Sequence, residues 1–134
     1  MEYNKGLTNV QTAFRKNRSI VDQIIKLQDE INRNIHTKRH TCGVFIDFER
    51  AFDMLWMKGV LIKLKRLNIS GNIYNWLQDF LQNRTCQVRV GNAVSTVRSP
   101  ENGTPQGSPL SPLLFLIAIN DLPDGLEKVK KCLF

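Results

Sequence analysis

The feature that most constrains the fold is the segment Leu113–Ile119, because every residue in it is apolar. Ser111 and Pro112 precede it, and they predict a helix with Ser111 as N-cap and Pro112 in the first position. A helix that is apolar on all sides has to be buried. The run is far shorter than the roughly 20 residues that a membrane-spanning helix needs. The rest of the chain must therefore pack around it.

Three amphipathic helices are predicted from apolar residues that recur at helical spacing. The first covers 20–35, where Ser19 and Asp22 are placed to form an N-cap and a capping box. The other two cover Met57–Leu67 and 73–81, with Asn68–Gly71 as the stop between them.

Strand signals lie between and after these helices. Val44, Ile46 and Phe48 share one face of a predicted strand over 43–48, and Phe45 and Asp47 share the other. A hairpin is predicted with strands 86–90 and 94–98 around a Gly-Asn turn, and a last strand begins near Val129 and Cys132–Phe134. Residues 100–109 are predicted to be irregular. Helices with a sheet indicate the α/β (α+β) class.

Composition favours a single domain with a polyanionic partner. The chain has 134 residues, and its 19 Lys and Arg against 12 Asp and Glu give a formal charge of +7. Nucleic acid is the first expectation and an acidic membrane surface the second. The three cysteines, Cys42, Cys86 and Cys132, have no disulfide or zinc spacing. No signal-peptide h-region is visible at the start, so we expect the nucleus and/or the cytoplasm and no secretion.

Asp47 is the most informative single residue. A carboxylate in an apolar strand costs several kcal/mol to keep ionised, unless a cation or hydrogen bonds compensate. For an isolated Asp, an edge strand facing water or a nearby Arg is the favoured explanation. A divalent metal is the alternative, and the surrounding residues favour it.

The segment 45–53, Phe-Ile-Asp-Phe-Glu-Arg-Ala-Phe-Asp, resembles motif A of reverse transcriptases. The segment 102–115, from Asn102-Gly-Thr-Pro-Gln-Gly to Phe115, resembles their motif B. Gln11–Ser19, with its Phe-Arg-x-x-Arg-Ser pattern, and Ile119–Pro123 resemble flanking segments of non-LTR (LINE-type, jockey-like) retrotransposon enzymes. The resemblance covers nearly the whole chain. The presence of both motifs, in this order and at this separation, is highly specific for reverse transcriptases.

The resemblance implies part of a right-hand polymerase palm with part of the fingers, a sheet backed by helices. It implies RNA-directed DNA synthesis, in which a dNTP is joined to a primer 3′-hydroxyl by two-metal nucleotidyl transfer. The partners would be an RNA template and a DNA primer, with no membrane. Asp47 would be the catalytic residue and bridge two Mg²⁺ ions, with Mn²⁺ as a possible substitute, and the Phe48 carbonyl would be a further metal ligand.

The same resemblance assigns residues that bind the nucleotide. Backbone amides near Arg50 and Ala51 would receive the triphosphate. The ring of Phe52 would exclude a 2′-hydroxyl and so select deoxynucleotides. Gln106 would contact the sugar near its 3′-hydroxyl, and Gly107 would let the base pair lie against the backbone. Taken alone, Phe52 would be a core residue and the Pro-Gln-Gly segment an ordinary turn.

Three further residues have alternative roles. Asp53 is predicted to cap the following helix, to support the site, or both, and capping is the simpler expectation. Arg15 and Arg18 match the family pattern and are predicted to contact nucleic-acid phosphates. Arg18 could equally pair with Asp22. His36 and His40 lack a third ligand, so a metal site is not indicated there.

Reverse transcriptases complete the metal site with an Asp-Asp motif on a later strand. No acidic residue follows Glu127, and Lys131–Phe134 resembles the approach to that motif. We therefore expect 1–134 to be a partial reverse transcriptase domain without the Asp-Asp motif, the upstream fingers segment or the thumb, inactive without the remainder of the polymerase. The predicted strand 44–48 would then present an open edge. Two alternatives are a non-catalytic basic nucleic-acid-binding remnant and an intron maturase.

Overall fold

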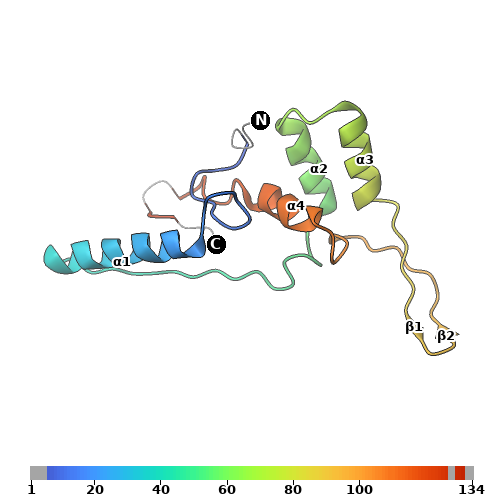
Figure 1. Ribbon diagram of the computed structural model, residues 1–134, viewed down its shortest axis with the longest axis horizontal. Coiled ribbons are helices and arrows are strands. Elements are labelled where there is room, and N and C mark those ends of the chain that lie inside the picture. Colours follow the sequence, from blue (N-terminus) through green and yellow to red (C-terminus); the bar gives the residue numbers. More distant parts are fainter. Residues whose placement is uncertain (1–5, 127–128, 132–134) are drawn as a thin grey trace. The chain divides into compact units, whose positions relative to one another are not determined.

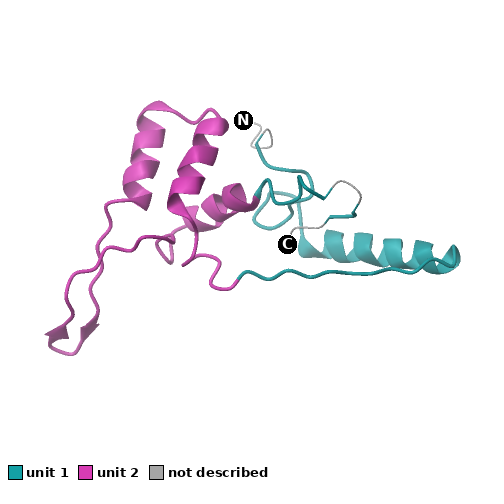
Figure 2. Cartoon of the chain, turned by 180° about the vertical axis from the view of Figure 1, so that it is seen from behind, with its two compact units in different colours: residues 1–48, 120–134 teal, residues 49–119 magenta. Residues whose placement is uncertain are grey.

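The computed structural model describes residues 6–126 and 129–131. The chain divides into two compact units, which are coloured separately in Figure 2. Unit 1 consists of Met1–Phe48 and Asn120–Phe134, and unit 2 is Glu49–Ile119. The regular secondary structure of the described residues is mostly helical, with one small antiparallel sheet (Figure 1).

Unit 1 contains the long helix α1, Ile20–His36. The predicted capping box is confirmed: the Asp22 amide donates to Ser19 Oγ over 3.4 Å, and the Ser19 amide donates to Asp22 Oδ2 over 2.9 Å. These bonds satisfy two of the amide groups that a helix start leaves without internal acceptors. Asp22 is therefore a capping residue.

The apolar stripe of α1 is largely uncovered. Ile20, Ile24 and Ile35 are each more than half exposed, whereas the one fully buried residue of the helix is Gln23. The side-chain Nε2 of Gln23 donates to the Val10 carbonyl over 3.1 Å. Periodicity thus predicted the helix correctly but did not predict what covers it.

The predicted strand over 43–48 is not formed in the part of the chain that the structure describes. Residues 41–48 are extended and run back along α1 (Figures 1 and 2), but no described strand pairs with them. Val44 is 82% exposed and Phe45 78%. Alternating side chains allow a strand, but its backbone groups need a neighbouring strand to bond with. The expected open edge is therefore an extended segment.

Asn120, which directly follows helix α4 (Leu110–Ile119), connects that part of the chain to the first described residues. Its Oδ1 accepts from the Thr8 amide over 2.7 Å, and its Nδ2 donates to the Gly6 carbonyl over 2.9 Å. The Asn120 side chain thus bonds two residues that are 112 and 114 positions away in the sequence. This accounts structurally for an Asn in the segment 119–123.

Unit 2 contains the hydrophobic core. Helices α2 (Met57–Arg66) and α3 (Gly71–Leu81) confirm the predicted pair, and α2 packs against both α3 and α4 (Leu110–Ile119) (Figure 1). Lys63 of α2 donates through Nζ to the Ala118 carbonyl near the end of α4. The core side chains are almost fully buried: Leu55, Met57, Val60, Leu61, Leu64, Leu77, Leu81, Leu114, Leu116 and Ile117.

Helix α4 begins earlier than predicted, at Leu110. Ser111 is therefore inside the first turn and is not the N-cap. Its hydroxyl donates to the Pro105 carbonyl over 2.7 Å, while Ser108 Oγ accepts from the Leu110 amide over 3.3 Å. Pro112 is tolerated because amides of the first turn have no acceptor within the helix.

The predicted hairpin is confirmed, with shorter strands. β1 (Arg89–Val90) pairs antiparallel with β2 (Ala93–Val94), Val90 opposite Ala93, around the Gly-Asn turn. Gly91 has a φ of 58°, which glycine adopts without strain. The bridge between Cys86 and Arg98 is offset by one residue from this register, so the ribbon is interrupted. Figure 1 shows it extending away from the helices of unit 2.

The expected α/β sheet backed by helices is thus corrected to a mostly helical arrangement with a two-stranded sheet among the described residues. The last predicted strand lies largely outside them: Cys132–Phe134 are not described, and Val129 is in a bend. No helix within 6–126 and 129–131 has the length and hydropathy needed to cross a membrane.

The α1 cap gives a testable prediction. Ser19→Ala removes the hydroxyl that accepts from the Asp22 amide and should destabilise the start of α1 by about 1 kcal/mol. Amide hydrogen exchange of the first turn measures this. Ser70→Ala is the matched control, because Ser70 is the N-cap of α3 and makes no side-chain cap bond. Equal effects of the two substitutions would contradict the assigned cap.

Candidate functional site

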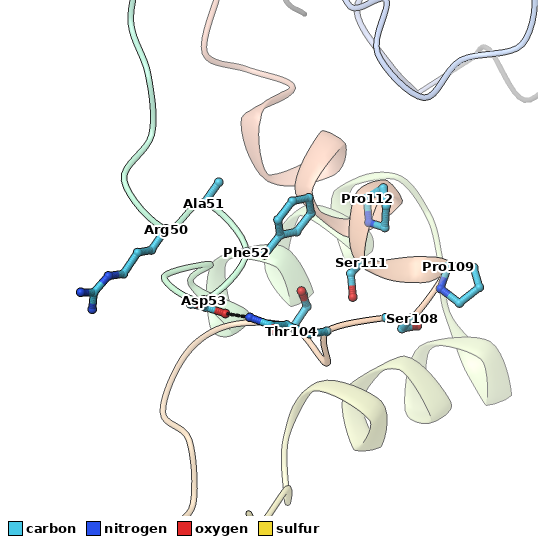
Figure 3. Close-up of a pocket in the computed structure, with 11 residues that line it drawn as sticks. Arg50, Ala51, Phe52, Asp53, Thr104, Ser108, Pro109, Ser111 and Pro112 are labelled. Atoms are coloured by element: carbon cyan, nitrogen blue, oxygen red, sulfur yellow. Dashed lines mark hydrogen bonds between the residues drawn. The ribbon is translucent and has the colours of Figure 1, made fainter.

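A pocket of about 440 Å³ lies in unit 2 (Figure 3). Two segments form it: residues 50–53 just before α2, and residues 104–112, which lead into α4. Both segments are irregular or begin a helix, and the helical core holds them in place. The lining residues are Arg50, Ala51, Phe52, Asp53, Thr104, Gln106, Gly107, Ser108, Pro109, Ser111 and Pro112.

The first wall is a tight turn. The Met54 amide donates to the Arg50 carbonyl over 2.9 Å, and Arg50 has a φ of 49°. A non-glycine residue in this left-handed region costs about 1–2 kcal/mol. Such local strain persists where the surrounding structure imposes it, and it is concentrated at functional sites.

The two walls are joined by backbone hydrogen bonds. The Gly103 amide donates to the Leu55 carbonyl over 2.8 Å, and the Thr104 amide donates to the Phe52 carbonyl over 3.0 Å. Gly103 has a φ of 87°, and a Cβ placed on it would lie 2.6 Å from the Asp53 carbonyl oxygen. Only glycine allows the segments to approach this closely.

Arg84 holds the second wall from behind. Its Nη2 donates to the Gly103 carbonyl over 2.6 Å and approaches Met57 Sδ at 3.2 Å, while its Nε donates to the Leu81 carbonyl over 3.0 Å. Leu81 ends α3, where carbonyls lack helical partners and a cation is favourable. A basic residue that the overall charge suggests for nucleic acid thus has a structural role.

The ring of Phe52 stands against Phe115 of α4, with ring centroids 5.4 Å apart and planes tilted by 46°. Tilted aromatic pairs of this kind are favourable and restrict ring movement. Phe52 is half-buried. It is therefore both part of the packing and a wall of the pocket (Figure 3).

Asp53 does not cap α2, so that expectation is wrong. The N-cap of α2 is Trp56, and no side chain caps that helix. Instead, Gln106 Nε2 donates to Asp53 Oδ1 over 2.9 Å, a bond between side chains 53 residues apart, drawn as a dashed line in Figure 3. The turn places Asp53 too far ahead of the helix to bond its first amides.

Thr104 was not singled out by sequence reasoning, although it lines the pocket. It is 5% exposed, and its hydroxyl has no hydrogen-bond partner among the residues that the structure describes. Leaving a buried hydroxyl unpaired costs about 1–3 kcal/mol. Gly103, Thr104 and Arg84 gain their roles from contacts between distant segments, which no local pattern indicates.

The structure brings the five predicted nucleotide-binding residues together. Arg50, Ala51, Phe52, Gln106 and Gly107 all line the same pocket, although they come from two widely separated segments. They lie together because the backbone hydrogen bonds of Gly103 and Thr104 join the two segments that carry them.

Asp47 and Phe48, the predicted metal ligands, belong to unit 1. Asp47 is exposed in the extended segment, and no cluster of three His, Cys, Asp or Glu side chains occurs within 6–126 and 129–131. The carboxylate and carbonyl oxygens are suitable donors for Mg²⁺. By themselves, however, the described residues do not form a metal site.

Arg15 and Arg18, the predicted phosphate contacts, both bond the loop before α1. Arg15 Nη1 donates to the carbonyls of Thr8 at 2.8 Å and Gln11 at 3.2 Å, and Arg18 Nη1 donates to the Asn9 carbonyl at 2.5 Å. Burial, and then the charge of Arg18, lower the pKa of Arg15. Both guanidinium groups therefore bond main-chain carbonyls of the loop before α1, and their predicted contact with phosphate stays a prediction.

Comparison with known proteins identifies the family. Residues 2–134 match the family described as reverse transcriptase (RNA-dependent DNA polymerase). The chain belongs to the reverse transcriptase family. This agrees with the two motifs whose residues line the pocket.

Relatives of this reverse transcriptase chain come from mobile elements of Drosophila melanogaster. It is 38% identical to the "Probable RNA-directed DNA polymerase from transposon BS" over 92% of the chain and 14% of that protein. It is 30% identical to the polymerase "from mobile element jockey" over 91% of the chain and 13% of that protein. It is 31% identical to the "Probable RNA-directed DNA polymerase from transposon X-element" over 84% of the chain and 12% of that protein.

The chain is thus a partial reverse transcriptase domain related to those of the jockey, BS and X-element non-LTR retrotransposons. It spans 12–14% of the length of these relatives. No solved structure matches it significantly.

The junction at Gly103 gives a prediction about stability. Gly103→Ala introduces a Cβ against the Asp53 carbonyl and strains the backbone, whereas Gly107→Ala adds only backbone strain, because nothing lies within 4 Å of its Cβ position. Gly107 has a similar φ of 82°. We expect Gly103→Ala to lower the free energy of unfolding by about 1–3 kcal/mol more than Gly107→Ala does.

Urea denaturation followed by circular dichroism measures this difference. Equal losses in the two variants would mean that the walls are not held together at Gly103.

Proposed function

We propose that the pocket in unit 2 binds the incoming deoxynucleoside triphosphate of RNA-directed DNA synthesis. The observation that carries this proposal is the gathering of Arg50, Ala51, Phe52, Gln106 and Gly107 around one cavity. The size of the cavity, about 440 Å³, lies in the range of small-molecule sites. Family membership supplies the reaction class.

The triphosphate would lie at the turn after Arg50. Amides at the start of a turn point outward without internal acceptors, and they bind anions well. The Arg50 guanidinium is exposed, and its ion pair with Glu49 is loose, at 3.8 Å. Its charge is therefore available to a phosphate.

The sugar would lie between Phe52 and Gln106. Because the Phe52 ring packs on Phe115, that contact would oppose a movement away from a bulky substituent. A 2′-hydroxyl would meet that ring, so ribonucleotides are disfavoured. Gln106 provides hydrogen-bonding groups for the sugar 3′-hydroxyl, and Gly107 allows the base pair to approach the backbone.

The complete polymerase would use divalent metal, with Mg²⁺ as the expected ion and Mn²⁺ as a substitute. When bound, such ions activate the primer hydroxyl and stabilise the leaving pyrophosphate. We propose that this chain contributes the Asp47 carboxylate and the Phe48 carbonyl. Further carboxylates would have to complete the site, since the described residues contain no metal cluster.

In this proposal the chain is part of a polymerase palm with part of the fingers. The template is RNA, the primer is DNA, and the site of action is the nucleus and/or the cytoplasm. The relatives are all enzymes of mobile elements, which favours a non-LTR retrotransposon over an intron maturase. The chain alone is proposed to be inactive.

The Phe52 proposal predicts a change in sugar selectivity. Phe52→Ala should reduce the preference for dGTP over GTP by about tenfold, because removing the ring makes room for the 2′-hydroxyl. Phe52→Tyr keeps the ring and should retain the preference. NMR titration of the chain with each nucleotide measures the two affinities. Equal affinity of the unsubstituted chain for dGTP and GTP would contradict this role.

Template-primed extension tests activity directly. With an RNA template, a DNA primer, dNTPs and Mg²⁺, we expect no incorporation by the chain alone, because one bridging carboxylate cannot by itself bind two metal ions tightly. Incorporation that is lost in Asp47→Asn would overturn the proposed inactivity. Salt-dependent nucleic-acid binding without dNTP binding would instead favour a non-catalytic remnant.

A further inference from the structure

Asp53 is an exposed carboxylate that lines a pocket proposed to bind an anionic nucleotide, and its position needs a reason. It does not cap α2, and within the described residues its carboxylate bonds Gln106. A negative charge at this place opposes a triphosphate. The role of the Asp53 carboxylate therefore lies in its hydrogen bond to Gln106.

A carboxylate can only accept hydrogen bonds, whereas the side-chain amide of glutamine has a donor end and an acceptor end. The 2.9 Å contact joins Gln106 Nε2 to Asp53 Oδ1. Turning the amide over would place its oxygen against the carboxylate oxygen, and two acceptors repel each other. The contact therefore selects one of the two amide orientations.

With Nε2 held by Asp53, the carbonyl oxygen Oε1 of Gln106 is directed away from that carboxylate. Gln106 lines the pocket and is exposed, so a bound ligand can reach this acceptor. The group that it would recognise is a donor, such as a ligand hydroxyl. A ligand with that hydroxyl gains a hydrogen bond that an analogue without it cannot make, so the site distinguishes the two.

We propose that Asp53 is a positioning residue, which fixes the Gln106 amide so that its carbonyl oxygen accepts from the 3′-hydroxyl of the bound nucleotide. This inference rests on the proposed function and deepens it. It makes Asp53 a determinant of selectivity between nucleotides with and without a 3′-hydroxyl, through its hydrogen bond to Gln106.

The backbone around Asp53 supports this role. Its carbonyl lies against Gly103, and the Thr104 amide bonds the neighbouring Phe52 carbonyl. The two side chains therefore meet across a junction that is held by main-chain contacts. Replacing the Asp53 side chain leaves those contacts in place, so a variant should keep the walls together.

The test compares the affinities of the 134-residue chain for dGTP and ddGTP by NMR titration. The unsubstituted chain should prefer dGTP. Asp53→Ala should reduce this preference by about three- to tenfold, the effect of one hydrogen bond. Asp53→Glu restores a carboxylate and should recover most of the preference.

Asp79→Ala is the matched control. Asp79 is an exposed residue of α3 outside the pocket, and its substitution changes the net charge by the same amount. It should leave the dGTP to ddGTP ratio unchanged. Circular dichroism confirms that each variant keeps its helices.

The side-chain amide signals of Gln106 provide a second readout that needs no nucleotide. They should shift in Asp53→Ala and stay in place in Asp79→Ala. Unchanged Gln106 signals, or an unchanged dGTP to ddGTP ratio in Asp53→Ala, would overturn the role of Asp53 alone. Absence of binding for both nucleotides in the unsubstituted chain would overturn the proposed function, and this inference with it.

Discussion

The close approach of the Gly103 backbone to the backbone of Asp53 is the contact on which the pocket depends. It allows two main-chain hydrogen bonds to join the turn before α2 to the loop before α4. A side chain at Gly103 would force these segments apart, because the obstacle is a carbonyl and not a flexible side chain. The lining residues from both walls face one cavity only while this junction holds.

The core of unit 2 supports that junction from the other side. The apolar helix α4 is buried against α2, and two cations bond carbonyl groups near helix ends: Lys63 at Ala118 of α4, and Arg84 at Leu81 of α3. Terminal carbonyls carry partial negative charge, so Lys and Arg are favourable there. The positive charge of this chain therefore has structural uses as well as any use toward nucleic acid.

Local patterns predicted the helices well and the strands less well. Helices close their hydrogen bonds within one segment, so apolar spacing together with Ser19 and Asp22 sufficed for α1. A strand needs a partner elsewhere in the chain. The hairpin has its partner a turn away and forms, whereas residues 43–48 have none among the described residues and remain extended. The apolar stripe of α1 could likewise be predicted from local spacing. Which residues cover that stripe depends on segments distant in sequence and could not be predicted.

By itself, the sequence determined the helices, the hairpin turn, the irregular segment before α4 and the family, through motifs that extend over nearly the whole chain. Only the tertiary structure decided that Asp53 bonds Gln106 and caps no helix, that Ser111 lies inside α4, and that Arg84 holds the loop at Gly103. Each of these roles depends on a contact between segments far apart in sequence. Residue spacing carries no information about such contacts, because packing and close backbone approach create them.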